Sequence, residues 1–150
     1  MSEKITSEGE KIAFLKEFQK SQNISTEVQS SLLWSVVENC GTPVTVSDHT
    51  DKDEVLIYCN KAFEDMTGYT YDEVIGKNCR FLQGEKTNKD DVQTIKEALS
   101  ANDGCEVSFV NYRKDGSAFW NKLSMSPVVV EGKVLFYLGL QNFLSEYSEE

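Results

Sequence analysis

Three long stretches of alternating residues in the second half of the chain constrain its fold most strongly. They read CEVSFVNYRK, AFWNKLSMSPVVV and KVLFYLGLQNF, and the pairs Asp115-Gly116 and Glu131-Gly132 separate them. Alternation is typical of strands with one buried face, and an Asp-Gly pair between such strands favours a tight hairpin. The sequence therefore predicts three consecutive antiparallel strands.

Two shorter strands and several helices are predicted ahead of these three strands. The short strands are PVTVSD and VLIYCN, and the second is apolar throughout, which predicts that it is buried. Two short helical pieces broken at Gly68 and Gly76 follow, and then a helix that begins at Thr87 or Asn88. Its apolar face is expected to comprise Val92, Ile95 and Leu99. The pattern predicts an α+β fold, with one antiparallel sheet and helices packed on one face.

Two amphipathic helices are expected before residue 42. The first lies within residues 10–22, and its apolar face comprises Ile12, Phe14, Leu15 and Phe18. The second begins at Ser25 or Thr26 and ends at Gly41, and its apolar stripe comprises Val28, Leu32, Val36 and Val37. We expect residues 1–41 to form a helical extension that covers the second face of the sheet and makes a symmetric homodimer. A helical cap without a partner is the alternative.

The charge balance argues against two classes of partner. The chain has 25 Asp and Glu against 15 Lys and Arg, a formal net charge of −10, and shows no basic stripe. Nucleic acid and anionic membrane surfaces are therefore not expected as partners. No apolar run approaches the roughly 18 residues needed to span a bilayer, and the N-terminus lacks the apolar core of a signal peptide. We expect a cytoplasmic protein.

The cysteines and the single histidine do not predict a metal site. Cys40, Cys59, Cys79 and Cys105 lack the close spacing of zinc ligands, and free thiols are expected rather than disulfides. His49 lies in the polar stretch SDHTDKDE, where a solvated loop residue is the expected reading.

The nine residues GKNCRFLQG, at positions 76–84, resemble the signature of the light-oxygen-voltage (LOV) flavin photoreceptors, a branch of the PAS fold. Three further segments resemble other parts of that family in the same order: YCNKAFEDMTGY, NYRKDGSAFWN and YLGLQ. The resemblance covers residues 42–142, which are expected to form the flavin-binding domain, with 143–150 as a short tail. It implies a PAS-like five-stranded antiparallel sheet and FMN as the cofactor.

The resemblance also implies the chemistry of the signature segment. Cys79 would add through Sγ to carbon 4a of the flavin after blue-light excitation, since a thiol held close to its target reacts readily. The Arg80 guanidinium and the Gln83 amide suit a phosphate and a polyol chain. The position where the family carries a second phosphate-binding arginine is Lys96 here, which keeps the charge but loses the bidentate fork.

The remaining candidate ligands lie on or beside the strands. Asn111 and Asn121 match family positions and suit the polar edge of the flavin ring, and Gln141 matches the glutamine that faces flavin N5. Asn78 precedes the reactive cysteine within the signature. Apolar residues expected to wrap the ring are Ile57, Leu82, Leu123 and Phe136. Cys59 is expected to be a packing residue.

The resemblance implies a short blue-light photoreceptor rather than an enzyme. Only NFLSEYSEE follows Gln141, so no fused effector is expected, and output would pass through altered dimerisation or an unknown signalling partner. Two alternatives remain open. One is a PAS module that binds another small ligand or only a protein, and the other is a redox flavoprotein, although the chain has no GxGxxG motif.

Overall fold

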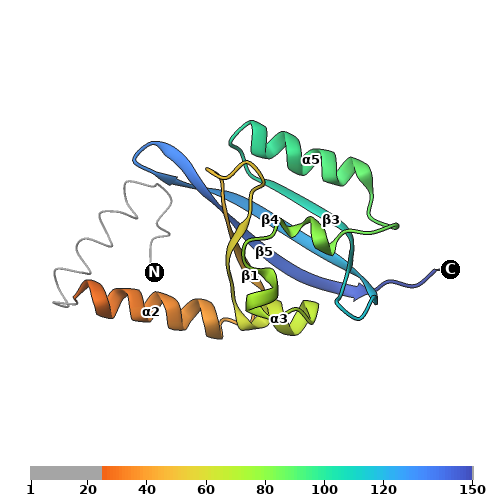
Figure 1. Ribbon diagram of the computed structural model, residues 1–150, viewed down its shortest axis with the longest axis horizontal. Helices are drawn as coiled ribbons and strands as arrows, with labels where there is room; N and C mark the ends of the chain where they lie inside the picture. Colours follow the sequence, from red (N-terminus) through yellow and green to blue (C-terminus); the bar gives the residue numbers. More distant parts are fainter. Residues whose placement is uncertain (1–24, 150) are drawn as a thin grey trace, which may run out of the picture. The chain divides into compact units, whose positions relative to one another are not determined.

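The computed structural model describes residues 25–149 and contains one five-stranded antiparallel sheet (Figure 1). Its strands, in chain order, are β1 (Val44–Asp48), β2 (Leu56–Cys59), β3 (Cys105–Tyr112), β4 (Ala118–Val130) and β5 (Lys133–Glu146). They are arranged in the order β2-β1-β5-β4-β3. The predicted hairpins between β3, β4 and β5 are confirmed, and β5 also pairs with β1, so the first and last strands lie side by side.

Short helices cover one face of this sheet. They are α3 (Lys61–Thr67), α4 (Tyr71–Val74), the 3-10 turn η1 (Cys79–Leu82) and α5 (Lys89–Ser100). The Asn60 side chain accepts a hydrogen bond from Phe63 N and so caps α3. The Asn88 side chain accepts from Asp90 N, so Asn88 rather than Thr87 caps α5. The predicted α+β architecture is confirmed.

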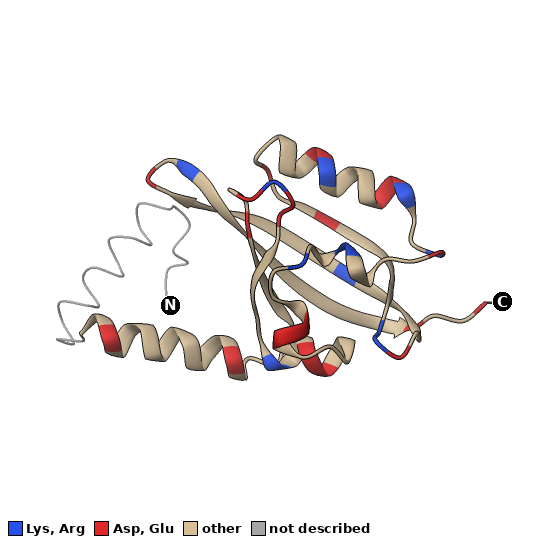
Figure 2. Ribbon diagram, in the orientation of Figure 1, with Lys and Arg blue, Asp and Glu red and all other residues tan. Residues whose placement is uncertain are grey.

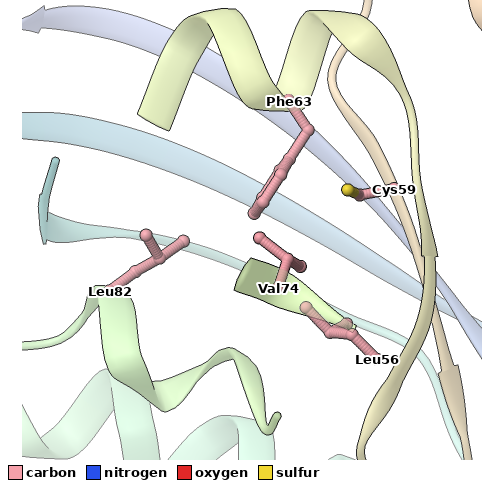
Figure 3. Close-up of a cluster of buried hydrophobic side chains, with 5 residues drawn as sticks. All are labelled: Leu56, Cys59, Phe63, Val74 and Leu82. Carbon is pink, nitrogen blue, oxygen red and sulfur yellow. The ribbon is translucent and has the colours of Figure 1, made fainter. Parts of the chain in front are cut away.

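Two clusters of buried side chains lie between the helices and the sheet. In the first, Leu56 and Cys59 from β2 pack with Phe63, Val74 and Leu82 from three helical segments, as Figure 3 shows. The second comprises Val107, Phe109 and Leu123 of β3 and β4, against which Ile95 of α5 packs. Members of both clusters line the cavity described below.

The prediction that β2 is buried throughout is wrong. Leu56 and Cys59 are 2% exposed, but Ile57 between them is 39% exposed. β2 is an edge strand, and only one of its faces points toward the helices. A run in which every residue is apolar conceals this alternation.

The last strand is longer than the sequence predicts. β5 continues to Glu146, within the segment expected to be a tail. The Arg113 guanidinium holds its end through two hydrogen bonds to the Glu146 carboxylate, at 2.8 and 2.9 Å. This bidentate pair lies beside the Arg113 contact with the Phe119 ring, and together they fasten the end of β5 to β3 and β4.

The helix α2 (Thr26–Asn39) begins as predicted, with Ser25 Oγ accepting a hydrogen bond from Val28 N. No side chain of α2 is buried, and Val28, Leu32 and Val36 are each more than half exposed.

The chain divides into two compact units, residues 1–37 and 38–150. The other expected helix, with Ile12, Phe14, Leu15 and Phe18, lies outside the described residues. Covering of the sheet and dimerisation by residues 1–41 therefore stay predictions. None of the helices in residues 25–149 has the length and apolar character needed to cross a bilayer.

Candidate functional site

The signature segment is shaped by its two glycines and by Asn78. Gly76 has a φ of +82°, a turn conformation that favours glycine. Gly84 lies against the Tyr112 ring, and a Cβ on Gly84 would be only 2.4 Å from a ring carbon. The Asn78 side chain accepts a hydrogen bond from Arg80 N and donates one to Asp53 O. These contacts hold η1 against the β1–β2 loop on one side and β3 on the other. Cys79, the first residue of η1, consequently lines a cavity.

This cavity lies between η1, α5 and the helix-facing side of the sheet. Seven of the residues predicted from the sequence line it: Asn78, Cys79, Arg80, Gln83, Asn111, Leu123 and Gln141. The fold thus brings the signature segment together with side chains from β3, β4 and β5.

Three buried amides form a hydrogen-bonded chain at the sheet wall of the cavity. Asn121 Nδ2 donates to Asn111 Oδ1 at 2.9 Å and to Gln141 Oε1 at 2.8 Å. Gln141 Nε2 in turn donates to Thr45 Oγ1 on β1 at 3.4 Å. Asn121 Oδ1 is buried and has no hydrogen-bond partner within the described part of the chain. A buried amide oxygen without a donor is unfavourable, so the amide chain lacks one hydrogen-bond donor at this point.

Cys79 carries a neutral thiol. Its pKa is raised to about 12: burial is the main cause, the neighbouring Cys59 also raises it, and a hydrogen bond with Gln141 partly offsets both. The thiolate is the strong nucleophile among cysteine forms. At neutral pH the sulfur must therefore lose its proton as it forms a bond, and it remains inert until that step is driven.

Arg80 lies at the rim of the cavity. Its guanidinium donates a hydrogen bond to Asp53 Oδ1 at 2.6 Å, and both side chains are more than half exposed. An ion pair this exposed contributes about 0–1 kcal/mol. Arg80 can therefore exchange Asp53 for a phosphate at little cost.

Five predicted site residues do not line the cavity. Asn121 is not part of the cavity lining but hydrogen-bonds to Asn111 and Gln141, which are, and Leu82 belongs to the buried cluster of Figure 3. Ile57 and Phe136 are each one residue out of phase with a neighbour that does line it, Leu56 and Tyr137. Lys96 is exposed on α5. Their predicted contacts with a ligand remain untested.

Several lining residues were missed from the sequence. Tyr137 and Gly139 share the phase of Gln141 on β5, and that two-residue period could have identified them. Ile95 and Leu99 were recognised as the apolar face of their helix but not as cavity lining. Nothing in the sequence pointed to Thr45 or Glu54.

The amide wall fits the pyrimidine edge of a flavin, which alternates carbonyl oxygens with an N–H group. Among residues 25–149, no cluster of three or more His, Cys, Asp or Glu side chains could hold a metal.

The sequence matches the PAS domain family over residues 42–142. The chain belongs to the PAS domain family.

The similar proteins place this PAS domain in the LOV branch. It is 44% identical over 99 residues to blue-light-activated histidine kinase 2 of Erythrobacter litoralis, covering 65% of this chain and 29% of that protein. The solved LOV domain of an Erythrobacter litoralis blue-light-activated histidine kinase is 40% identical with a TM-score of 0.68, covering 70% of this chain and 97% of the other. An RNA-binding LOV receptor is 37% identical with a TM-score of 0.77, covering 81% of this chain and 35% of the receptor.

The shared region is only part of the longer relatives. The chain spans 18 to 29% of the length of three curated relatives that it matches at 42 to 44% identity.

Proposed function

We propose that this LOV domain senses blue light by holding FMN in the cavity and using Cys79 as its photoactive thiol. One observation carries the proposal: the Cys79 thiol lines the same cavity as the Asn111 and Gln141 amides, which Asn121 links by hydrogen bonds. The named relatives support a light-sensing role.

The residues have separable roles in this proposal. Arg80 and Gln83 would hold the phosphate and the polyol chain, and Asn111 and Asn121 the polar edge of the ring. Bound FMN would supply a light-excited ring whose carbon 4a accepts a bond from Cys79 Sγ. Cys79 holds its proton in the dark and gives it up only as that bond forms, because burial disfavours the free thiolate.

Gln141 is the residue through which the sheet would respond. Its amide accepts from Asn121 on β4 and donates toward Thr45 on β1. Rotation of the amide exchanges its donor and its acceptor, so both contacts must change together. We propose that this change reaches the chain outside the domain, where it alters a homodimer made by the N-terminal helices or the binding of a signalling partner.

The test is the light-minus-dark absorption spectrum of the purified protein and of Cys79→Ala. The wild type is expected to show a blue flavin band that bleaches and recovers. Cys79→Ala should still bind flavin, because the phosphate and ring contacts lie elsewhere, but it should not bleach and should fluoresce more. Cys40→Ala, which removes an exposed thiol, is the matched control and should behave as the wild type.

Two results would contradict the proposal. Bleaching retained in Cys79→Ala and lost in Cys59→Ala would assign the chemistry to the buried Cys59 thiol. A wild-type protein that shows no flavin band after reconstitution with FMN would instead indicate a PAS module for another ligand.

A further inference from the structure

Glu54 places a carboxylate at the cavity that holds Cys79. Its side chain is only 20% exposed. The residue lies in the loop between β1 and β2 with a φ of +51°, a left-handed conformation that is uncommon for residues with a Cβ. The fold accepts a strained backbone here and turns a charged side chain inward, as is typical of functional positions.

The contacts of His49 place its ring where it can share one proton with Glu54. His49 Nδ1 lies 2.5 Å from Glu54 Oε1, and His49 Nε2 lies 2.8 Å from Asn102 Oδ1. An amide oxygen only accepts, so Nε2 carries a hydrogen. If the ring is neutral, Nδ1 carries no hydrogen and the protonated Glu54 carboxyl group donates to it. If the ring is charged, Nδ1 donates to the Glu54 carboxylate. Both arrangements hold a single proton between Glu54 and His49.

The pair connects the cavity to the surface. Glu54 Oε2 is buried and has no hydrogen-bond partner in the described chain, so it is available to a group in the cavity. At the other end, the contact between His49 and Asn102 is exposed. The Tyr137 ring packs edge-on against the imidazole, with centroids 5.0 Å apart, and fixes its orientation.

The surroundings favour retention of that proton. Burial raises the pKa of Glu54, and Asp48 and Asp51 of the same acidic loop also raise it, while His49 lowers it (Figure 2). Tyr137 on β5 interacts with Glu54 and also with Asp103 and Cys105, which lie just before and at the start of β3. Most of these groups are acids, so an ionised Glu54 would add a further negative charge beside them, which is unfavourable.

We propose that Glu54 and His49 form a proton relay between the cavity and solvent, and that the relay serves the return of Cys79 to its dark state. This inference rests on the proposed function. In the return step the carbon–sulfur bond breaks and leaves its electron pair on sulfur, which takes one proton. The relay would accept the one proton that ring nitrogen N5 releases and would return one proton to sulfur, and the electron pair of the N5–H bond would restore the N5–C4a double bond. Protons and electrons balance without an oxidant or reductant.

The kinetic test uses the full chain with FMN bound and measures dark recovery after a light pulse. Glu54→Gln keeps the shape and a hydrogen bond but cannot carry the proton, so recovery should slow by about tenfold or more. His49→Gln should slow it similarly, and the double variant should be no slower than either single one, because both belong to one path. Added imidazole should speed Glu54→Gln by a larger factor than the wild type.

The matched control is Glu106→Gln, which removes a carboxylate bonded to Lys122 and Ser124 outside the cavity. Its recovery should stay within about twofold of the wild type. Recovery in Glu54→Gln within the same twofold, or losses that multiply in the double variant, would overturn the relay.

A second measurement needs no photochemistry and separates the relay from the proposed function. His49 is the only histidine, so nitrogen NMR of its ring in the dark gives one pair of signals. The wild-type Nδ1 signal should be that of a nitrogen sharing a proton, and in Glu54→Gln it should become that of a bare acceptor. Identical Nδ1 signals in both proteins would overturn the relay. A wild type that shows the shared proton but never bleaches would support the relay and contradict the proposed function.

Discussion

At the scale of single residues, the partly buried Cys79 thiol makes folding sensitive to alkaline pH. Its folded pKa of about 12 lies above the value near 8.5 of an unfolded cysteine. The stabilisation from this group is therefore complete below about pH 8.5 and is lost as the pH rises toward 12. The thiol of the unfolded chain ionises first, and this ionisation lowers the free energy of the unfolded state.

We predict that the free energy of unfolding of the flavin-free protein falls more steeply above pH of about 8.5 than that of Cys79→Ala. Urea titrations at several pH values measure this difference. Cys40→Ala serves as the control, because Cys40 is exposed. Parallel profiles for the wild type and Cys79→Ala would show that the thiol ionises as freely in the folded protein as in the unfolded chain.

A second residue-scale prediction concerns the phosphate. Arg80→Ala should weaken FMN binding by about 1.5–3 kcal/mol, roughly tenfold to a hundredfold, and weaken riboflavin binding much less, because riboflavin has no phosphate. Asp53→Asn should leave FMN binding equal or tighter, since it removes the carboxylate that now pairs with Arg80. Fluorescence titration with both ligands tests this, and equal losses for FMN and riboflavin in Arg80→Ala would exclude a phosphate contact.

At the scale of elements, the pairing of β1 with β5 depends on a close approach. Thr45 lies opposite Gly139, and a Cβ on Gly139 would be 2.5 Å from Thr45 Oγ1. Gly139→Ala should therefore destabilise the protein by about 1–3 kcal/mol, as overpacked positions do. Thr45→Ala combined with Gly139→Ala should recover part of that loss.

Chemical denaturation measures both effects. Leu140→Ala, at the adjacent exposed position, is the control and should cost less than Gly139→Ala. A Gly139→Ala protein as stable as the wild type would mean that the two strands separate without penalty.

The same strands show what the sequence could and could not predict. Turn residues and alternation were enough to predict β3, β4 and β5, because local chemistry determines hairpins. The phase of β2 and β5 was harder, and Ile57 and Phe136 were chosen where Leu56 and Tyr137 line the cavity. In strands rich in apolar residues both faces look alike, and only the packing of the helices selects one. Glu54 could not be predicted at all, since its inward orientation depends on a backbone conformation that its sequence does not favour.

At the scale of the whole molecule, the exposed apolar face of α2 predicts self-association. Leu32→Glu should lower the dimer fraction, measured by light scattering in the dark and under blue light, without changing the flavin spectrum. Ser30→Glu adds the same charge to an exposed polar position of α2 and should leave the dimer intact. A full chain that is monomeric in both states at high concentration would contradict the predicted homodimer.

The pairing of β1 with β5 also sets when the protein can fold during its synthesis. β1 leaves the ribosome early, but its neighbour in the sheet is the last strand to be made. Until that strand emerges, β1 lacks a partner on one side and the cavity lacks the wall that carries Tyr137, Gly139 and Gln141. Contacts this distant in sequence form slowly. A nascent chain stalled before residue 133 should therefore leave the cofactor in solution, and the cell can load this sensor only after its final strand is translated.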